Sequence, residues 1–196
     1  MSDHNQEMGA RRLPKMPALE DRVLAGLAKF DTPALADAMH GANYIDPAIG
    51  PLYPGMAQLT GNAVTVAVPV GSQEVRKIAM AMCGPGDVLV VAARAISIYA
   101  VLGGGLARQL KAQNIVGVVI DGYVRDFDEI RVLEIPVYCR GRTIHASPKG
   151  GPGEVNVPVA CGGAVVSPGD VIRGDENGVV AVPRQAAAHL LAKLCG

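Results

Sequence analysis

A glycine-rich segment followed by an apolar run and an acidic turn constrains the fold most. Residues 103–129 read GGGLARQLKAQNIVGVVIDGYVRDFDE. The spacing after the glycines predicts a helix from Leu106 to Gln113, and the apolar run from Ile115 to Ile120 predicts a buried strand. In a parallel α/β arrangement, a helix start and the carboxyl end of a neighbouring strand face the same crevice. The segment therefore predicts a site with backbone N–H donors, a guanidinium and carboxylates, which suits a small carboxylate substrate and a hard divalent cation.

The rest of the chain alternates helices and strands in its centre and reads as hairpins in its last third. Spacing and capping residues predict helices over 19–30, 32–41, 72–82, 126–133 and 183–194, with Thr32 and Ser72 as N-caps. Strands are expected over 62–68, 88–92, 136–140, 155–160, 164–166, 171–172 and 179–182. Two Pro-Gly-Asp turns precede strands, and Asp87 and Asp170 are interpreted as structural because Asp hydrogen-bonds its own turn. These elements predict a mixed α/β sandwich without a domain boundary.

Length and composition exclude several classes of protein. A chain of 196 residues suffices for one domain with a substantial core. We expect residues 1–17 to be a flexible, polar N-terminal arm and residues 18–196 to be a single domain. The 18 basic and 18 acidic residues balance, and only two Phe and no Trp are present, so no nucleic-acid partner is expected. The absence of a signal core, a long apolar window and any C-x-x-C pair predicts a cytoplasmic protein with reduced thiols and no membrane partner.

The residues of the candidate site each allow two interpretations. Gly103, Gly104 and Gly105 either relieve crowding where a helix packs on a sheet, or present helix-start N–H groups to an anionic oxygen. Arg125 either forms a surface salt bridge or holds a carboxylate or enolate oxygen through paired hydrogen bonds. Neither a Walker loop nor a G-x-S-x-G elbow is present, and the histidines lack partners, so nucleotide binding and nucleophilic catalysis are poorly supported.

Two roles also fit Asp126. It either caps the helix that starts beside it, or it ligates Mg²⁺, which prefers one or two carboxylates and keeps its waters. Glu129 is three residues further on, on the same helical face, and is a candidate to hold a metal-bound water.

These residues resemble a known family. Gly104, twenty residues, Arg125-Asp126, two residues and Glu129 match the G-x20-R-D-x2-E/D signature of the RraA-like family. The family includes 4-hydroxy-4-methyl-2-oxoglutarate aldolases and regulators of ribonuclease E activity. The similarity extends from about Leu19 to Pro183 and includes the segments PGDVLVV, VVIDGYVRD and DENGVVAVP.

The resemblance implies a swivelling β/β/α-type α-β-β-α sandwich assembled as a homotrimer or a hexameric dimer of trimers. It implies that Asp126 binds Mg²⁺ or Mn²⁺, that Arg125 holds the pyruvyl oxygens, and that the amides of Gly105 and Leu106 receive the carboxylate. The implied activity is metal-dependent retro-aldol cleavage of a small 2-oxo-acid substrate. In it, waters held by Asp126 and Glu129 take the C4-hydroxyl proton and a pyruvate enolate forms. Oxaloacetate decarboxylation passes through the same enolate.

Two departures from the aldolases bear on the substrate. Several of them carry Asp where this chain has Gly104, and many have a C-terminal extension that sends an acid into the neighbouring subunit's site. Here the last helix, after Pro183, contains no acid. We therefore expect decarboxylase or broad 2-oxo-acid lyase activity, with a non-catalytic regulator of ribonuclease E as the alternative. The methyltransferase label also attached to this family finds no supporting glycine loop in the sequence.

Overall fold

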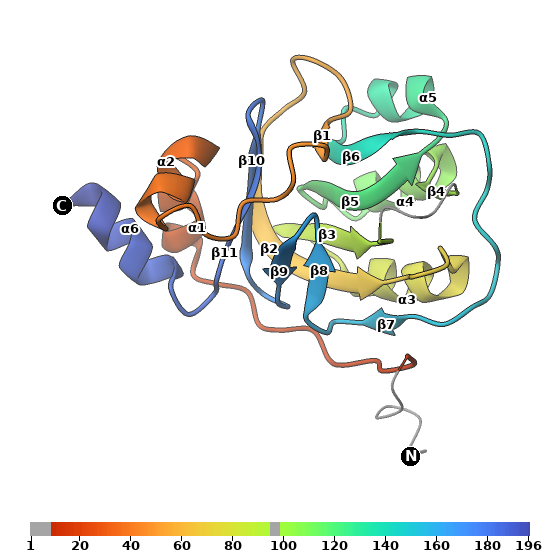
Figure 1. Ribbon diagram of the computed structural model, residues 1–196, viewed down its shortest axis with the longest axis horizontal. Helices are drawn as coiled ribbons and strands as arrows, with labels where there is room; N and C mark the ends of the chain where they lie inside the picture. Colours follow the sequence, from red (N-terminus) through yellow and green to blue (C-terminus); the bar gives the residue numbers. More distant parts are fainter. Residues whose placement is uncertain (1–8, 95–98) are drawn as a thin grey trace.

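A mixed β-sheet forms the centre of the molecule, with helices and a small hairpin packed around it (Figure 1). The computed structural model describes residues 9–94 and 99–196. The strands are β1 (Gly50–Pro51), β2 (Leu59–Ala67), β3 (Asp87–Ala92), β4 (Ala100–Leu102), β5 (Gly117–Val124), β6 (Val137–Arg142), β7 (Glu154–Val155), β8 (Val159–Cys161), β9 (Ala164–Val166), β10 (Val171–Asp175) and β11 (Gly178–Val182). The helices are α1 (Asp21–Leu27), α2 (Thr32–Ala38), α3 (Gln73–Met82), α4 (Gly104–Ala112), α5 (Phe127–Val132) and α6 (Ala187–Cys195).

The strand order of the large sheet is β1-β6-β5-β3-β2-β10-β11, with β4 beside β5 and β7 beside β2. Strands β2, β3, β5 and β6 run parallel to one another, and β10 and β11 extend the sheet as an antiparallel hairpin. All six residues of β3 are buried. A strand buried on both faces needs an apolar run rather than an alternating pattern, as the Val- and Leu-rich sequence of β3 provides.

Each face of the sheet is covered by a different layer. Helices α3, α4 and α5 lie on one face, where Val75, Ala107 and Ile130 join the larger core cluster (Figure 1). The opposite face packs against the β8–β9 hairpin and the segment 45–56. Helices α1, α2 and α6 close the β10–β11 end of the sheet in a third cluster. The expected mixed α/β fold is confirmed, with this third helix group at the sheet's end.

The two Pro-Gly-Asp turns have the structural role expected of them. Asp87 Oδ2 accepts the N–H of Gly84 at 2.7 Å, and Asp170 Oδ2 accepts the N–H of Ser167 at 2.7 Å. Asp170 Oδ1 also accepts the N–H of Arg184 at 2.9 Å, which joins the turn to the end of β11. Both carboxylates are buried and used within the fold.

One predicted helix cap is wrong. Asp31, not Thr32, caps α2, because its side chain accepts the N–H of Ala34 at 2.8 Å. Thr32 is the first helical residue, and its N–H and hydroxyl both donate to the carboxylate of Asp175 at 2.7 Å. Asp175, the last residue of β10, is thus a long-range acceptor for the N–H and the hydroxyl of Thr32. The cap predicted at Ser72 is confirmed, since its hydroxyl accepts the N–H of Val75 at 3.5 Å.

The described part of the expected N-terminal arm, residues 9–17, is held along the body of the protein. Arg11 forms an ion pair with Glu154 at 2.6 Å, and the N–H of Leu13 donates to the carbonyl of Val155 at 3.1 Å. Further along, Lys15 pairs with Asp87. Backbone pairing and ion pairs thus connect this part of the segment to β7 and to Asp87 at the start of β3. Residues 1–8 lie outside the described residues.

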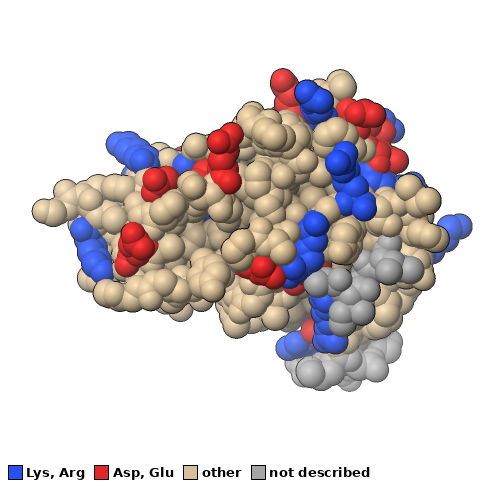
Figure 2. Space-filling view, turned by 45° about the horizontal axis from the view of Figure 1, so that its top comes forward, with Lys and Arg blue, Asp and Glu red and all other residues tan. Residues whose placement is uncertain are grey.

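Within residues 9–94 and 99–196, no helix combines the length and apolar character needed to cross a bilayer. On the face drawn in Figure 2, acidic and basic side chains are interspersed and separated by uncharged surface.

Candidate active site

Two parallel strand ends bring the predicted site residues together. Strand β4 ends at Leu102 and pairs in parallel with β5, with Leu102 opposite Val124. The next residue after β5, Arg125, donates its N–H to the carbonyl of Leu102 at 3.0 Å. Gly103 and Arg125 therefore leave the sheet side by side. The predicted meeting of a helix start with a strand end is confirmed, although the three-residue strand β4 was not expected.

The side chain of Asp126 is turned toward α4 and away from α5. Asp126 has left-handed backbone geometry, with φ of 58°, and it makes no side-chain cap bond to α5. Its Oδ2 instead accepts the N–H of Gly104 at 3.0 Å, and Arg125 Nε lies 3.5 Å from the same oxygen. This geometry excludes the capping role. A non-glycine residue held in this region carries backbone strain, which is common where a side chain must be aimed at a ligand.

The three glycines have three different surroundings. A Cβ on Gly103 would lie 2.7 Å from Asp126 Oδ2, closer than side chains tolerate, and at a tight 3.2 Å from Arg125 Nε. A Cβ on Gly104 would overlap the carboxylate of Glu129. At Gly105 the nearest atom would be Arg108 Nη2 at 3.9 Å, which leaves open space. The absence of side chains at the first two positions is thus what lets Arg125, Asp126 and Glu129 approach α4.

The N–H groups of the first turn of α4 are only partly used. That of Gly104 donates to Asp126, and that of Leu106 donates to the carbonyl of Gly103 at 3.1 Å. Among the described residues, the N–H of Gly105 has no acceptor. Gly105 is also exposed, so its N–H is the donor most available to an anion.

Glu129 lies behind this turn. Its carboxylate pairs with Arg108 and packs against Gly104. It does not line the pocket described next, whereas Arg125 and Asp126 do. Of the three predicted catalytic residues, the structure therefore brings two to the pocket and sets the third against the helix start.

A pocket of about 300 Å³ opens beside Arg125 and Asp126. Helix α3 and helix α4 form two of its walls, and the segment after β6 closes it. Its lining residues are Gln73, Arg76, Lys77, Ala100, Gly103, Gly105, Leu106, Gln109, Arg125, Asp126, Ala146 and Ser147. The predicted residues Gly103, Gly105 and Leu106 thus share one pocket with Arg125 and Asp126, and three cations face it with one carboxylate.

A second hollow of about 330 Å³ lies on the other side of Arg125 and Asp126. Phe127, Arg142 and Ile144 are among its lining residues. The guanidinium of Arg142 lies over the Phe127 ring, 4.4 Å from its centroid, and Ile144 is 87% exposed. The Arg125-Asp126 turn therefore separates a polar pocket from a hollow with an exposed apolar residue at its edge.

Arg76 is a pocket residue that the sequence patterns did not reveal. Only 2% of it is exposed, and burial lowers the pKa of its guanidinium to about 10. Nε donates to the carbonyl of Ser72 at 3.2 Å, and Nη2 donates to the hydroxyl of Ser147. No carboxylate of the described chain pairs with it. The segment 147–148 packs against α3 here, and this long-range contact is not visible in the local sequence.

Asp121, four residues before Arg125 in the sequence, lies away from the site. Strand β5 continues to Val124, so Asp121 lies within the strand. Its carboxylate accepts Nε of Arg140 at 2.5 Å and the N–H of Gly162 at 3.0 Å, beside the β8–β9 hairpin. The alternation of side chains along β5 puts Asp121 on the hairpin-covered face with Val119, whereas Ile120 faces the helices.

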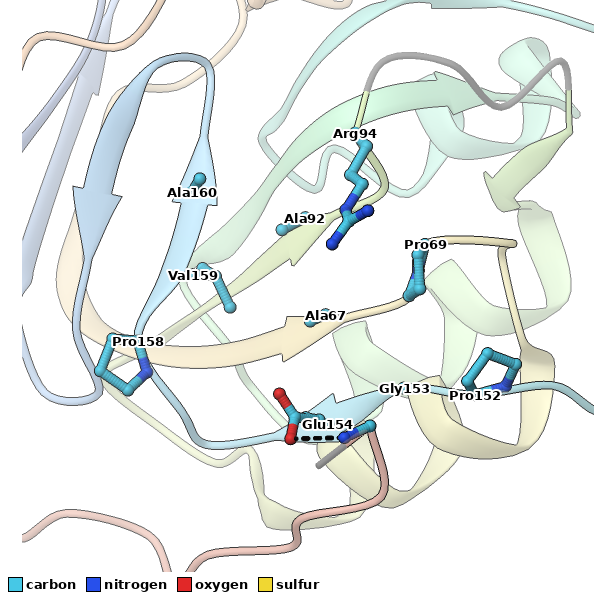
Figure 3. Close-up of a pocket in the computed structure, with 11 residues that line it drawn as sticks. Ala67, Pro69, Ala92, Arg94, Pro152, Gly153, Glu154, Pro158, Val159 and Ala160 are labelled. Carbon is cyan, nitrogen blue, oxygen red and sulfur yellow. Dashed lines mark hydrogen bonds between the residues drawn. The ribbon is translucent and has the colours of Figure 1, made fainter. Parts of the chain in front are cut away.

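Another cavity, of about 320 Å³, lies between β2, β3, β8 and residues 152–154 (Figure 3). Arg94 points its guanidinium into it, among Ala67, Pro69 and Ala92. The one carboxylate on its lining, Glu154, is already bonded to Gly9 and Arg11. None of the predicted site residues lines this cavity, so the Arg125-Asp126 pocket is the better candidate.

The donor set at Asp126 suits a hydrated Mg²⁺ rather than a dehydrated structural metal. No group of three or more His, Cys, Asp or Glu side chains gathers within the described part of the chain in a way that could hold a metal. Asp126 Oδ2 is bonded to Gly104, while Oδ1 has no protein partner among the described residues. One free carboxylate oxygen at the mouth of a pocket fits a cation that keeps most of its waters.

Comparison with known proteins agrees with this geometry. The family "RraA-like: Aldolase/RraA" matches residues 32–181. A Halalkalibacterium halodurans protein named "Putative 4-hydroxy-4-methyl-2-oxoglutarate aldolase" is 38% identical over 162 residues, which is 83% of this chain and 77% of that protein. The "4-hydroxy-4-methyl-2-oxoglutarate aldolase" of Thermus thermophilus is 35% identical over 137 residues, covering 70% of this chain and 83% of that protein.

Solved structures include a similar protein from Streptomyces coelicolor, described as "an unusual member of the RNase ES inhibitor RraA protein family". The two share a TM-score of 0.81 and 27% identity over 92% of this chain and 93% of that chain. The match of the family to residues 32–181 covers most of the chain and includes the whole Gly103–Glu129 segment. This chain therefore belongs to the RraA-like aldolase family.

Proposed function

We propose that this protein is a divalent-metal-dependent lyase that cleaves 4-hydroxy-2-oxo acids to pyruvate and also decarboxylates oxaloacetate. The observation that carries the proposal is the contact between the Arg125-Asp126 turn and the first turn of α4. It puts a guanidinium, a free carboxylate oxygen and an unused N–H around one pocket. Relatives named as aldolases add support.

Substrate binding would use the amides of α4 and the side chain of Arg125. The carboxylate of the 2-oxo acid accepts the N–H of Gly105. It also accepts the N–H of Leu106, which it shares with the carbonyl of Gly103. Arg125 holds the 2-oxo oxygen and stabilises the negative charge that develops on it when the enolate forms. Gly103 keeps the guanidinium close to the helix start, because a side chain there would collide with it.

Asp126 would hold the metal through Oδ1, with waters completing the coordination. When bound, Mg²⁺ or Mn²⁺ supplies Lewis-acid polarisation of the 2-oxo and carboxylate oxygens. Oδ2 remains bonded to Gly104, which fixes the orientation of the carboxylate.

Cleavage needs a base for the C4 hydroxyl. A water held by Asp126 takes this proton, and C4 becomes a carbonyl as the C3–C4 bond breaks. The electron pair of the broken C3–C4 bond enters the pyruvate enolate. Protonation of the enolate at C3 gives pyruvate. We predict that Glu129, which packs against Gly104, helps to hold the carboxylate of Asp126 and the water that this carboxylate binds. With oxaloacetate, CO₂ leaves instead and gives the same enolate.

The test is a coupled assay of pyruvate release with oxaloacetate and several 4-hydroxy-2-oxo acids, with and without Mg²⁺. Release that disappears with EDTA and returns with Mg²⁺ would support the proposal. Metal-loaded, folded protein that releases no pyruvate from any of these substrates would refute it.

A second candidate is a non-catalytic regulator that binds a ribonuclease. Its support is the similarity to the Streptomyces coelicolor protein described as belonging to the RNase ES inhibitor family. Direct binding to ribonuclease E by Arg125→Ala protein that has lost pyruvate release would favour this role.

We also propose that the protein works as a cytoplasmic homo-oligomer, a trimer or a dimer of trimers. Val132 and Ile144 are more than four-fifths exposed, at 82% and 87%, and Ile144 edges the hollow beside Arg125. Large exposed apolar side chains are frequent at subunit contacts. Light scattering over a concentration series tests the assembly.

A further inference from the structure

Arg76 is a buried cation that has no counter-ion among the described residues. Its exposed fraction is 2%, and the groups it meets are a backbone carbonyl and a hydroxyl, not a carboxylate. Taking a charged group out of water is costly unless an opposite charge compensates it. Burial lowers its pKa only to about 10, so the guanidinium stays protonated at neutral pH.

The guanidinium has hydrogen-bonding capacity left over. Nε is bonded to Ser72 and Nη2 to Ser147, whereas Nη1 has no acceptor within the described residues. Arg76 lines the same pocket as Arg125 and Asp126. Lys77, the next residue of α3, lines it from an exposed position.

The charges of the pocket are arranged on two elements. Arg125 and Asp126 lie in the turn after β5, against the first turn of α4, where the 2-oxo end of the substrate binds in the proposed function. Arg76 and Lys77 come from α3, which forms a different wall. Two further positive charges on that wall exceed what a single carboxylate needs.

We propose that Arg76, assisted by Lys77, binds the second carboxylate of a dicarboxylic 2-oxo acid and makes the pocket selective for dicarboxylates. The assignment of the 2-oxo end rests on the proposed function above. Arg76 is then a specificity-determining residue, and the second carboxylate of the ligand is the counter-ion that its guanidinium lacks.

A purely structural role is the competing explanation. Arg76 and Gln73 both donate to Ser147, so α3 fixes the segment 146–148. In this structural role Arg76 only has to donate a hydrogen bond to Ser147, and the protein would not distinguish between ligands through it. The two roles therefore differ in what the ligand's second carboxylate contributes.

Isothermal titration of the Mg²⁺-loaded protein with 2-oxoglutarate and with 2-oxopentanoate separates the two roles. These probes have the same chain length and differ in the second carboxylate. We expect wild type to bind 2-oxoglutarate about tenfold or more tightly than 2-oxopentanoate, the size of a charge-assisted hydrogen bond. Arg76→Met abolishes this preference and leaves 2-oxopentanoate binding unchanged.

Controls address charge and packing. Arg22→Met removes an equal charge from an exposed surface pair with Glu20 and keeps the preference. Ser147→Ala removes the hydrogen-bond partner of Arg76 Nη2, and this variant should also keep the preference for 2-oxoglutarate. If Arg76→Met does not fold, as judged by circular dichroism, the same titrations are made with Lys77→Met and Arg76→Lys. The proposal then requires that both variants reduce the preference for 2-oxoglutarate.

The inference is overturned if wild type shows no preference, or if Arg76→Met weakens both ligands equally. Its failure can be told apart from failure of the lyase proposal. Equal pyruvate release from substrates with and without a second carboxylate refutes only the selectivity. A preference that depends on Arg76, in protein that never releases pyruvate, refutes only the lyase.

Discussion

The carboxylate of Asp126 accepts the N–H of Gly104 at 3.0 Å, which joins the turn after β5 to the start of α4. This contact uses the N–H of Gly104, the first residue of α4, and leaves the N–H of Gly105 for a ligand. It also holds Asp126 in a left-handed conformation that the turn alone would not favour. The consequences can be tested at the glycines, the carboxylates and the segments that surround the site.

Gly103→Ala should reduce activity without unfolding the protein. The new Cβ would lie 2.7 Å from Asp126 Oδ2 and 3.2 Å from Arg125 Nε, so both side chains must move. A displacement of about 1 Å in a catalytic group costs up to roughly 100-fold in rate. We expect kcat/KM for pyruvate release to fall by about that factor. Gly84→Ala is the matched control, because its Cβ would meet no atom within 4 Å and Gly84 does not line the pocket. Equal losses in the two variants would contradict the account.

Gly104→Ala and Glu129→Ala should be strongly non-additive. The Cβ that Gly104→Ala introduces would occupy the place of the Glu129 carboxylate and displace it from Arg108. Once the carboxylate has been removed, the three atoms that lie nearest to this Cβ are gone. A double-mutant cycle on thermal stability and on kcat/KM should therefore show that Gly104→Ala costs little in the Glu129→Ala background. Additive effects would show that the two residues do not compete for this space.

Asp175 should make stability depend on pH in the acid range. Burial disfavours its charge, but hydrogen bonds from Thr32 and Asn177 outweigh this and lower the pKa of Asp175 below its ordinary value. A lowered folded-state pKa contributes stability above the unfolded value of about 3.9, and this is lost as pH falls through the folded pKa. Asp175→Asn should cost about 1–3 kcal/mol at neutral pH. In urea denaturation, the gap to wild type should close between roughly pH 5 and pH 2, and a constant gap would argue against the assignment.

The N-terminal segment should depend on Glu154. Its carboxylate accepts Arg11 Nε at 2.6 Å and the N–H of Gly9 at 3.0 Å. Glu154→Ala should release residues 9–13 and make trypsin cleavage after Arg11 and Arg12 several-fold faster, measured by mass spectrometry. Glu20→Ala breaks an exposed pair with Arg22 and should leave this cleavage rate unchanged. Unchanged cleavage in Glu154→Ala would mean that backbone pairing with β7 alone holds the segment.

Local patterns predicted much of the fold, because many elements are set by short-range chemistry. The Pro-Gly-Asp turns have the hydrogen bonds expected at Asp87 and Asp170, and the apolar run of β3 became a buried strand. The cap predicted at Thr32 is wrong because no local pattern reveals that Asp175, far along the chain, accepts its N–H and hydroxyl.

The site was predictable only in part, for the same reason. Arg125 and Asp126 could be found because they follow an apolar strand directly. The direction of Asp126 and the burial of Arg76 depend on how α3, α4 and residues 146–148 pack, which no spacing rule encodes. The separate roles of Gly103 and Gly104 likewise appear only once Asp126 and Glu129 are seen beside them.

Pyruvate release by wild type, Arg125→Lys and Asp126→Asn, each measured with Mg²⁺ and with EDTA, tests the central claim most directly. We predict Mg²⁺-dependent release by wild type from oxaloacetate or a 4-hydroxy-2-oxo acid. Both variants should lose roughly 100-fold or more of kcat/KM while keeping wild-type thermal unfolding. Release that persists in EDTA, or variants as active as wild type, would contradict the proposed function.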